Sequence, residues 1–319
     1  MKKQQIKFEQ IIDRGCGIDI HKSVLVATIR GTGLKEQTRS YSSFTESVEE
    51  LRDWLLENAI THVAMESTGV YWKPVYNVLE EHFEVVLVNA RHVKNVPGKK
   101  TDKKDSEWLA KLLLSGLLQG SFIPPKPTRE LRDLTRYRRK VTGTIASEKN
   151  RVQKILEDGN IKLSSVVSNM SGRVATKIIN AILEGQEDIS ELVKFHHGKM
   201  KASPEQLASS LKGFLTDHHR FMLSMIKDSI ADKQAIIEKI DKRIETHLKE
   251  HQYDLDAQLL ATIPGVGKDA AAGILAEIGN KMEQFPSAQH LASWAGMSPG
   301  NNESAGKKKV VEPPKPTNT

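Results

Sequence analysis

Isoleucine recurs through Thr216–His251 at a helical spacing that constrains the fold more than any other feature of the chain. The positions are Ile226, Ile230, Ile237, Ile240 and Ile244, in steps of three and four residues broken only by Lys233. This spacing predicts a long helix with an apolar stripe, which needs a second helix to cover it. Thr128–Leu156 has a similar stripe at Leu134, Val141, Ile145, Val152 and Ile155. The two segments predict a long helical hairpin or coiled coil, paired either within one chain or between two chains.

The residues before Pro124 have a different pattern, in which short β-rich runs alternate with helical segments. Strands are predicted at residues 14–19, 23–29, 36–42, 61–65 and 84–89, and helices at residues 46–58, 70–83 and 102–118. The first three strands are too close together for parallel connections and must pair antiparallel. This order predicts an α/β layer architecture with a mixed sheet.

Three domains follow from these patterns. We expect an α/β domain at residues 1–125, a helical coiled-coil region at residues 126–255 and a small α-helical domain at residues 256–319. The last domain opens with two apolar helical stretches on either side of the turn Pro264–Gly267. From about residue 308 the chain has no periodicity and is expected to be disordered.

Composition excludes several classes of protein. The single cysteine, Cys16, excludes a disulfide framework and a Cys-rich zinc site. The chain begins without a signal-peptide core, and no apolar run reaches the roughly 18 residues of a membrane span, so we expect a soluble cytoplasmic protein. The 47 Lys and Arg residues against 40 Asp and Glu residues give a net charge of +7, which makes polyanions plausible partners.

Four carboxylates stand out by position. Asp19 and Glu66 each end a predicted strand, and Asp102 and Asp105 open a helix three residues apart, with Cβ atoms about 5–6 Å from each other. If the first and fourth strands are neighbours, these acids converge at one edge of the sheet. Such like charges need a compensating cation. Hard oxygen ligands suit Mg²⁺, and a pair of such ions stabilises phosphodiester transfer.

Taken singly, each of these acids is more simply explained as a helix cap or a solvated surface residue. The combination is more specific because a basic run surrounds the helical pair: Arg91, Lys94, Lys99, Lys100, Lys103 and Lys104. Basic side chains beside a metal-binding acid cluster suit a nucleic-acid backbone, although a solvated loop explains the basic run equally well.

Three further features are candidates for contact with nucleic acid or for chemistry. Arg129, Arg132, Arg136 and Arg139 share one helix face, which favours either phosphate contact or a solvated coiled-coil flank. The turn with Gly265, Gly267 and Lys268 resembles a helix-hairpin-helix DNA-binding turn, but alone it is more simply a tight helix connection. Ser304 lies among small residues and lysines and is a candidate nucleophile, although most serines in such loops have no catalytic role.

Several ordered motifs together resemble the DEDD insertion-sequence transposases. The N-terminal motifs are GIDIHK at residues 17–22, MESTGVYW at residues 65–72 and KTDKKD at residues 100–105. The C-terminal motifs are IPGVG at residues 263–267, GMSPG at residues 296–300 and ESAGK at residues 303–307. The resemblance spans both ends of the chain, and the family also has a helical middle.

The resemblance implies a RuvC-like RNase H fold for the first domain, with Mg²⁺ held by Asp19, Glu66, Asp102 and Asp105. It implies that Ser304 attacks the DNA backbone and forms a covalent phosphoserine intermediate. Family members act as dimers and tetramers guided by a structured RNA from their own element, which pairs with donor and target DNA. We therefore expect a transposase or recombinase whose partners are DNA, a guide RNA and further copies of the chain.

One departure from the family concerns the end of the chain. Family members usually continue past the serine motif with a basic, glycine-containing stretch and further helices, whereas this sequence ends GKKKVVEPPKPTNT. We therefore expect a truncated C-terminal domain, whose effect on the support around Ser304 and on activity is open.

Three other functions stay open. The first is a RuvC-like structure-specific nuclease, in which water attacks in place of serine. The second is a catalytically dead remnant that only binds nucleic acid. The third is an actin-like ATPase or sugar kinase, which GIDIHKS loosely resembles, but the sequence lacks the second Asp-Gly-rich phosphate segment of that fold.

Overall fold

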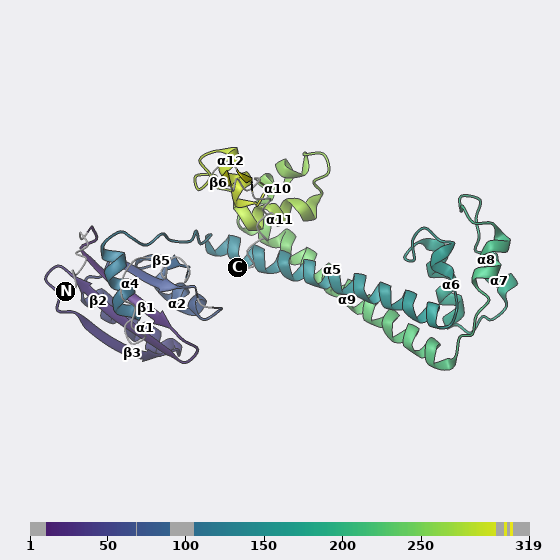
Figure 1. The fold of residues 1–319 in the computed structure, drawn as a ribbon, viewed down its shortest axis with the longest axis horizontal. Helices are drawn as coiled ribbons and strands as arrows, with labels where there is room; N and C mark the ends of the chain where they lie inside the picture. The colour runs from purple at the N-terminus through teal and green to yellow at the C-terminus, as the bar shows by residue number, and fades with distance from the viewer. Residues whose placement is uncertain (1–10, 68, 90–104, 298–302, 305–306, 309–319) are drawn as a thin grey trace. The chain divides into compact units, whose positions relative to one another are not determined.

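The computed structural model describes residues 11–67, 69–89, 105–297, 303–304 and 307–308, whose backbone is traced in Figure 1. The chain divides into two compact units, Met1–Ile123 and Pro124–Thr319. The boundary falls at Pro124 and Pro125, directly before the long helical part of the chain.

Unit 1 is built on one mixed sheet of five strands in the order β3-β2-β1-β4-β5. The strands are β1 (Arg14–Ile20), β2 (Val24–Gly31), β3 (Gln37–Ser42), β4 (His62–Glu66) and β5 (Glu84–Val88). β2 pairs antiparallel with β1 and β3, whereas β4 pairs parallel with β1 and β5. The predicted α/β class with a mixed sheet is confirmed, and the first and fourth strands are neighbours. The RNase H fold itself stays a prediction.

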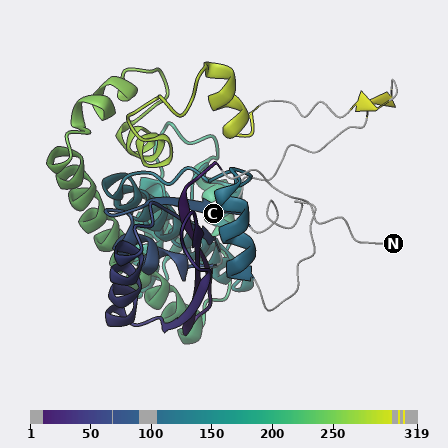
Figure 2. The ribbon, with the colours of Figure 1, turned by 90° about the vertical axis from the view of Figure 1, so that its left-hand side faces the viewer.

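Helices cover both faces of this sheet. α1 (Thr45–Glu57) and α4 (Asp105–Leu114) lie on opposite sides of the strands in Figure 2. Successive side chains of a strand point to opposite faces. The core on the α1 side therefore takes Cys16, Ile18 and Ile20 from β1, together with residues of α1 and α2 (Trp72–Leu79). The core on the α4 side packs Leu109, Leu112 and Leu113 against Ala64 and Val88.

Two helices of unit 1 differ in length from the prediction. The helix predicted at residues 70–83 is confined to Trp72–Leu79. The helix predicted at residues 102–118 is described from Asp105 and ends at Leu114, because Gly116 takes a left-handed conformation (φ 62°) that stops a helix. Residues 102–104 lie outside the described part of the chain.

Unit 2 contains a long antiparallel helical hairpin formed by α5 (Lys126–Asp158) and α9 (Asp217–Glu250). The start of α5 meets the end of α9, where His247 Nε2 lies 2.8 Å from the carbonyl oxygen of Pro127. The opposite ends are joined by His219 and Asp158, with 2.8 Å between Nε2 and Oδ2. The two predicted stripes therefore pair within one chain.

Smaller helices pack at both ends of the hairpin. η1 (Leu163–Ser165), α6 (Arg173–Leu183), α7 (Ile189–Val193) and α8 (Pro204–Ser210) share a core with the end of α5. At the other end are α10 (Asp254–Ala261), α11 (Lys268–Ile278) and α12 (Ala288–Trp294), followed by the paired strands β6 (Glu303–Ser304) and β7 (Lys307–Lys308).

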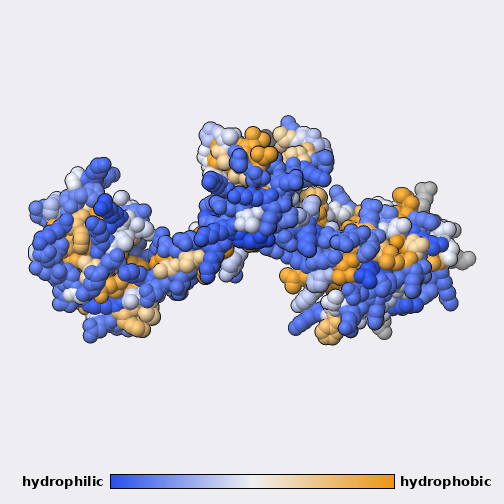
Figure 3. All heavy atoms as spheres, turned by 180° about the vertical axis from the view of Figure 1, so that it is seen from behind, coloured by the Kyte–Doolittle hydropathy of each residue, from blue (hydrophilic) through white to orange (hydrophobic). Residues whose placement is uncertain are grey.

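The α10–α12 segment is joined to the hairpin by the apolar face of α11. Ala272, Leu275 and Ala276 pack with Leu131 of α5 and Ile244 of α9. The segment leaves other large apolar side chains exposed, including Leu255 and Leu259, and hydrophobic atoms are visible on it in Figure 3. None of the described helices combines the length and the apolar character that a membrane span requires.

Candidate functional site

Asp19 and Glu66 lie side by side on the face of the sheet that α4 covers. The parallel register of β1 and β4 places Ile18 opposite Met65, and the two acids are the next residues of their strands. Ile18 and Met65 both belong to the core on the α1 side. Because side chains alternate along a strand, Asp19 and Glu66 point to the other side, toward α4.

Gly17 fixes the position of α4 over the same strand. A β-carbon at Gly17 would lie 2.2 Å from the Ser106 carbonyl oxygen and 2.4 Å from the Ala110 nitrogen, so the helix backbone rests directly on β1. At Gly15 the nearest side chain is instead Leu113, near the end of α4. α4 therefore runs opposite to β1, and its first residue, Asp105, lies toward the strand end that carries Asp19.

A chain of three hydroxyl groups, on the buried residues Ser106 and Thr28 and the exposed Thr38, attaches the start of α4 to the sheet. Ser106 Oγ lies 2.8 Å from Thr28 Oγ1, which lies 2.9 Å from Thr38 Oγ1 on β3. Thr28 is fully buried and sits opposite Gly17 in the β1–β2 register. These contacts hold the first turn of α4, and with it Asp105, against the sheet.

Three of the four predicted carboxylates, those of Asp19, Glu66 and Asp105, are thus brought to one face of unit 1, which we call the acidic face. All three residues are partly exposed. His21 Nε2 lies 3.2 Å from Asp19 Oδ2, so one carboxylate oxygen already has a polar neighbour. Partly exposed carboxylates grouped in this way fit the oxygen ligands that Mg²⁺ prefers. Asp102 and the six basic residues of the predicted loop, Arg91, Lys94, Lys99, Lys100, Lys103 and Lys104, lie outside the described residues.

The predicted arginine face of α5 makes contacts inside unit 2. Arg132 donates from Nε to the carbonyl oxygen of Ala276 (2.9 Å) and from Nη2 to that of Glu277 (3.0 Å), at the end of α11. Arg136 binds both carboxylate oxygens of Glu277, at 2.9 and 3.0 Å. Arg129 donates from Nη1 to the Pro124 carbonyl oxygen, and Arg139 is exposed. Phosphate contact by this face stays a prediction, whereas the hydrogen bonds from Arg132 and Arg136 to the end of α11 were not predicted.

The Glu277 carboxyl group has a lowered pKa in this arrangement. Burial raises the pKa, but the hydrogen bond from Arg136 and the charges of Arg136 and Arg132 outweigh it. Glu277 is therefore held in its charged form at the junction of α11 with α5.

The glycine turn connects α10 to α11. Gly265 has a φ of 87°, which favours glycine, Gly267 is the residue before α11, and Lys268 is exposed at its first position. Lys268 and Arg139 line the same groove, together with Arg138 and Lys249. Asp241, Glu245, Asp254 and Asp269 also line this groove, so its charges balance. The groove therefore has no excess of positive charge for a phosphate.

Ser304 ends β6 and lies opposite Lys307 of β7 in a two-stranded antiparallel ladder. Glu303 lies opposite Lys308 in the same pair. The described residues of the predicted serine motif therefore belong to a short β-pair in unit 2.

Two positioning features of the acidic face were not recognised from the sequence. The role of Gly17 could have been recognised from the local sequence, because an isolated glycine inside a strand often marks the close approach of another backbone. No pattern in the sequence predicts the Ser106–Thr28 contact, since the two residues are far apart in the sequence and neither belongs to a charged motif.

Comparisons with known proteins match both ends of the chain. Residues 16–161 match the model of the IS110-type DEDD domain, described as a transposase, and residues 257–315 match that of the "Transposase IS116/IS110/IS902 family". The chain is 25% identical over 304 residues to the pilin gene-inverting proteins of Moraxella lacunata and Moraxella bovis. Each alignment covers 90% of this chain and 73% of the relative. The acidic face lies in the first matched region, and Ser304 lies in the second.

Proposed function

We propose that this chain, which matches two IS110-type transposase models, is a recombinase that cuts and rejoins DNA using a divalent metal and a serine nucleophile. The observation that carries the proposal is the placement of Asp19 and Glu66 on neighbouring parallel strands beneath α4, whose first residue is Asp105. The relatives are named for inverting a gene. Inversion requires that cut strands be rejoined, which favours a recombinase over a simple nuclease.

The acidic face is proposed to hold Mg²⁺ through Asp19, Glu66 and Asp105, with Asp102 as a fourth ligand. A bound Mg²⁺ would polarise the phosphate and offset the charge that develops on its oxygens. The chain's own part is to keep the carboxylates grouped. Two of them are set by the β1–β4 register, and the third by the seating of α4 on Gly17 and Thr28.

Ser304 is proposed as the nucleophile. Its hydroxyl oxygen forms a bond to a backbone phosphorus, one phosphorus–oxygen bond of the DNA breaks, and the leaving DNA oxygen gains a proton as the serine loses one. The covalent phosphoserine is itself a phosphodiester, of similar energy to the DNA bond that was broken. A hydroxyl of another DNA strand can therefore attack its phosphorus, which forms a new DNA phosphodiester and releases the serine. No external energy source is then needed for strand exchange.

The proposed partners are DNA, a structured guide RNA from the chain's own element, and further copies of the chain as dimers or tetramers. Support for nucleic-acid binding comes from the net charge of +7. Base pairing by the RNA would supply sequence selection that the protein itself does not need to provide.

A covalent-adduct experiment tests the proposal. Purified protein is mixed with Mg²⁺, DNA carrying the ends of its element and RNA from the adjacent non-coding segment, and the products are separated on a denaturing gel. We expect a DNA-shifted protein band that is absent for Ser304→Ala and for Asp19→Asn. Ser293→Ala and Asp53→Asn, which change exposed residues of the same types in the same units, are expected to retain it.

The outcomes separate the competing functions. Free nicked DNA that persists in Ser304→Ala would replace the serine recombinase with a nuclease that uses water. Binding of RNA or DNA with no adduct and no nick would leave a binding protein without catalysis. Omitting the RNA is expected to abolish the adduct, and an adduct of equal yield without RNA would overturn the guide-RNA part of the proposal.

A further inference from the structure

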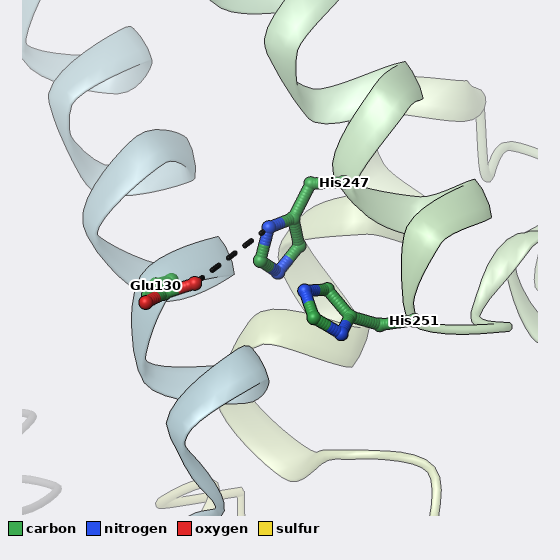
Figure 4. A group of neighbouring side chains, drawn as sticks. All are labelled: Glu130, His247 and His251. Atoms are coloured by element: carbon green, nitrogen blue, oxygen red, sulfur yellow. Dashed lines mark ion pairs between the residues drawn. The ribbon is translucent and has the colours of Figure 1, made fainter.

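A second group of potential metal ligands belongs to unit 2, whereas the carboxylates described above belong to unit 1. Glu130 of α5, His247 of α9 and His251, the residue that follows α9, each offer one ligand atom, and these atoms lie within 4.8 Å of one another. Figure 4 shows the three side chains gathered between the start of α5 and the end of α9. Neither the DNA chemistry proposed above nor the sequence motifs use any of them.

His247 is held in the orientation of a metal ligand. Its side chain is fully buried, and Nε2 lies 2.8 Å from the Pro127 carbonyl oxygen. A carbonyl only accepts, so Nε2 carries the hydrogen and Nδ1 is left with a lone pair. A hydrogen bond from the far nitrogen to a backbone carbonyl is the usual way in which proteins orient a histidine ligand.

The lone pair of His247 Nδ1 has no hydrogen-bond partner among the described residues, although the atom is buried. The nearest carboxylate oxygen, Glu130 Oε2, is 4.0 Å away, which is too far for a hydrogen bond. A buried polar atom of this kind is costly unless a proton or a metal occupies the space before it. Figure 4 shows Glu130 on the Nδ1 side of the His247 ring and His251 beside the same ring.

The surroundings favour a cation at this point. His247 and His251 are four residues apart and share one face at the end of α9, with ring centroids separated by 4.4 Å. The C-terminal end of a helix carries a partial negative charge, and Glu130 adds a carboxylate. The Thr128–Tyr253 hydrogen bond, 2.9 Å long and buried, holds the start of α5 to the segment that follows α9.

We propose that Glu130, His247 and His251 form a binding site for a divalent transition metal, with Zn²⁺ as the expected occupant. Two imidazole nitrogens and one carboxylate favour zinc over magnesium or calcium, which prefer oxygen ligands alone. In a tetrahedral zinc site the ligand atoms are about 3.3 Å apart, since each lies about 2.0–2.1 Å from the metal. The ligand atoms lie within 4.8 Å of one another, so the exposed Glu130 and half-buried His251 side chains need to move inward to reach this geometry.

Such a site would join the two ends of the hairpin. Glu130 lies near the beginning of α5 and the histidines lie at the end of α9, so the bound metal links segments that are far apart in the sequence. Because the unfolded chain does not hold these groups together, Zn²⁺ would stabilise the folded hairpin, and the gain would grow with the logarithm of the Zn²⁺ concentration above the Kd. Three protein ligands leave a fourth position for water or another donor.

The test uses the full-length chain carrying Asp19→Asn, which disables the acidic face of unit 1 and keeps it from dominating metal binding. The protein is stripped with a chelator, titrated with Zn²⁺ against a chromogenic competitor, and analysed for bound metal and for Tm. We expect one Zn²⁺ per chain and a Tm that rises with Zn²⁺ concentration.

Substitutions of the accessible ligands identify the site without disturbing the buried histidine. Glu130→Gln and His251→Gln are each expected to weaken Zn²⁺ binding by about tenfold or more and to remove the Tm increase. His218→Gln, at an exposed histidine in the first turn of the same helix, is the matched control and should bind as the parent does.

Two results would overturn the proposal. One is the absence of stoichiometric Zn²⁺ in the Asp19→Asn chain, and the other is equal affinity in Glu130→Gln, His251→Gln and His218→Gln. Neither result bears on the covalent-adduct experiment, so a failure here leaves the proposed DNA chemistry to its own test.

Discussion

The backbone of Ser106 lies so close to Gly17 that a β-carbon on Gly17 would stand 2.2 Å from the Ser106 carbonyl oxygen. A side chain at position 17 would not fit in this space, because β-carbons in proteins essentially never approach other heavy atoms so closely. This contact sets the height of α4 above β1, and thereby the distance between Asp105 and the two strand carboxylates. The acidic face therefore depends on a residue that has no side chain.

Gly17→Ala is expected to push α4 away from the sheet. The added methyl group would also meet the Ala110 nitrogen at 2.4 Å, so backbone rather than a flexible side chain has to move. Overpacking of this kind costs about 1–3 kcal/mol of unfolding free energy. Chemical denaturation measures the loss, and the covalent-adduct yield should fall with it. Gly143→Ala is the control, because its β-carbon meets nothing within 4 Å and should stabilise helix α5 by about 0.5–1 kcal/mol.

Ser106→Ala is expected to weaken the attachment of α4 while leaving the fold intact. It removes a buried hydrogen bond to Thr28, which is worth about 1 kcal/mol. Thr28 keeps its second contact, to Thr38, so its hydroxyl is not left without a partner. A double-mutant cycle with Thr28→Val measures the coupling between the two residues. Additive effects of the two substitutions would contradict the claim that they act through one hydrogen bond.

The junction between α5 and α11 is expected to weaken in acid through Glu277. The pKa of Glu277 is lowered in the folded chain, so its unfolded form binds a proton more readily than its folded form does. The resulting stability is present above the unfolded pKa of about 4.3 and is lost as the pH falls through the folded pKa.

Glu277→Gln isolates this contribution. At neutral pH the substitution should cost about 1 kcal/mol, because Arg136 loses a charged partner for both of its hydrogen bonds. The difference from the unsubstituted chain should shrink as the pH is lowered below about 4. Unfolding curves across this pH range provide the measurement, and Glu283→Gln, at an exposed position of the same segment, should show no such dependence.

Cys16 is expected to report on the unfolding of unit 1. It is the chain's single cysteine, its side chain is fully buried in β1, and burial raises the pKa of the thiol well above its usual range. Thiol reagents attack the thiolate, so the native chain should be labelled only as fast as unit 1 opens. Mass spectrometry after timed labelling gives this rate, with the denatured chain as the fully reactive control. Rapid labelling in native buffer would contradict the burial of Cys16.

Much of the local structure was predictable because it depends on short-range periodicity. The isoleucine spacing in residues 216–251 gave α9 within one residue of its observed start and end. The strand predictions at residues 14–19 and 61–65 found β1 and β4, and closely spaced strands gave the antiparallel pairing of β1 with β2. Helix ends were less accurate where the signal is conformational, as at Gly116.

The residues of the candidate site were easier to predict from the sequence than the contacts that hold them in place. Asp19 and Glu66 were recognisable because each ends a strand, but their adjacency needed the parallel pairing of β1 with β4. Arg132 and Arg136 share a helix face, as their spacing requires, yet both bind the end of α11. Spacing along one helix identifies a basic face and leaves open which surface that face meets.

The sequence by itself determined the α/β class of unit 1, the two long helices of unit 2 and the motifs that carry the family resemblance. Backbone geometry imposes a period of two residues on strands and 3.6 residues on helices, so these elements can be predicted from the pattern of neighbouring residues. Only the tertiary structure decided that α4 rests on Gly17 and that Glu130 meets His247 and His251 across the hairpin. These contacts join residues far apart in the chain, and they form because burying the apolar faces of α4, α5 and α9 brings the polar groups beside them into register.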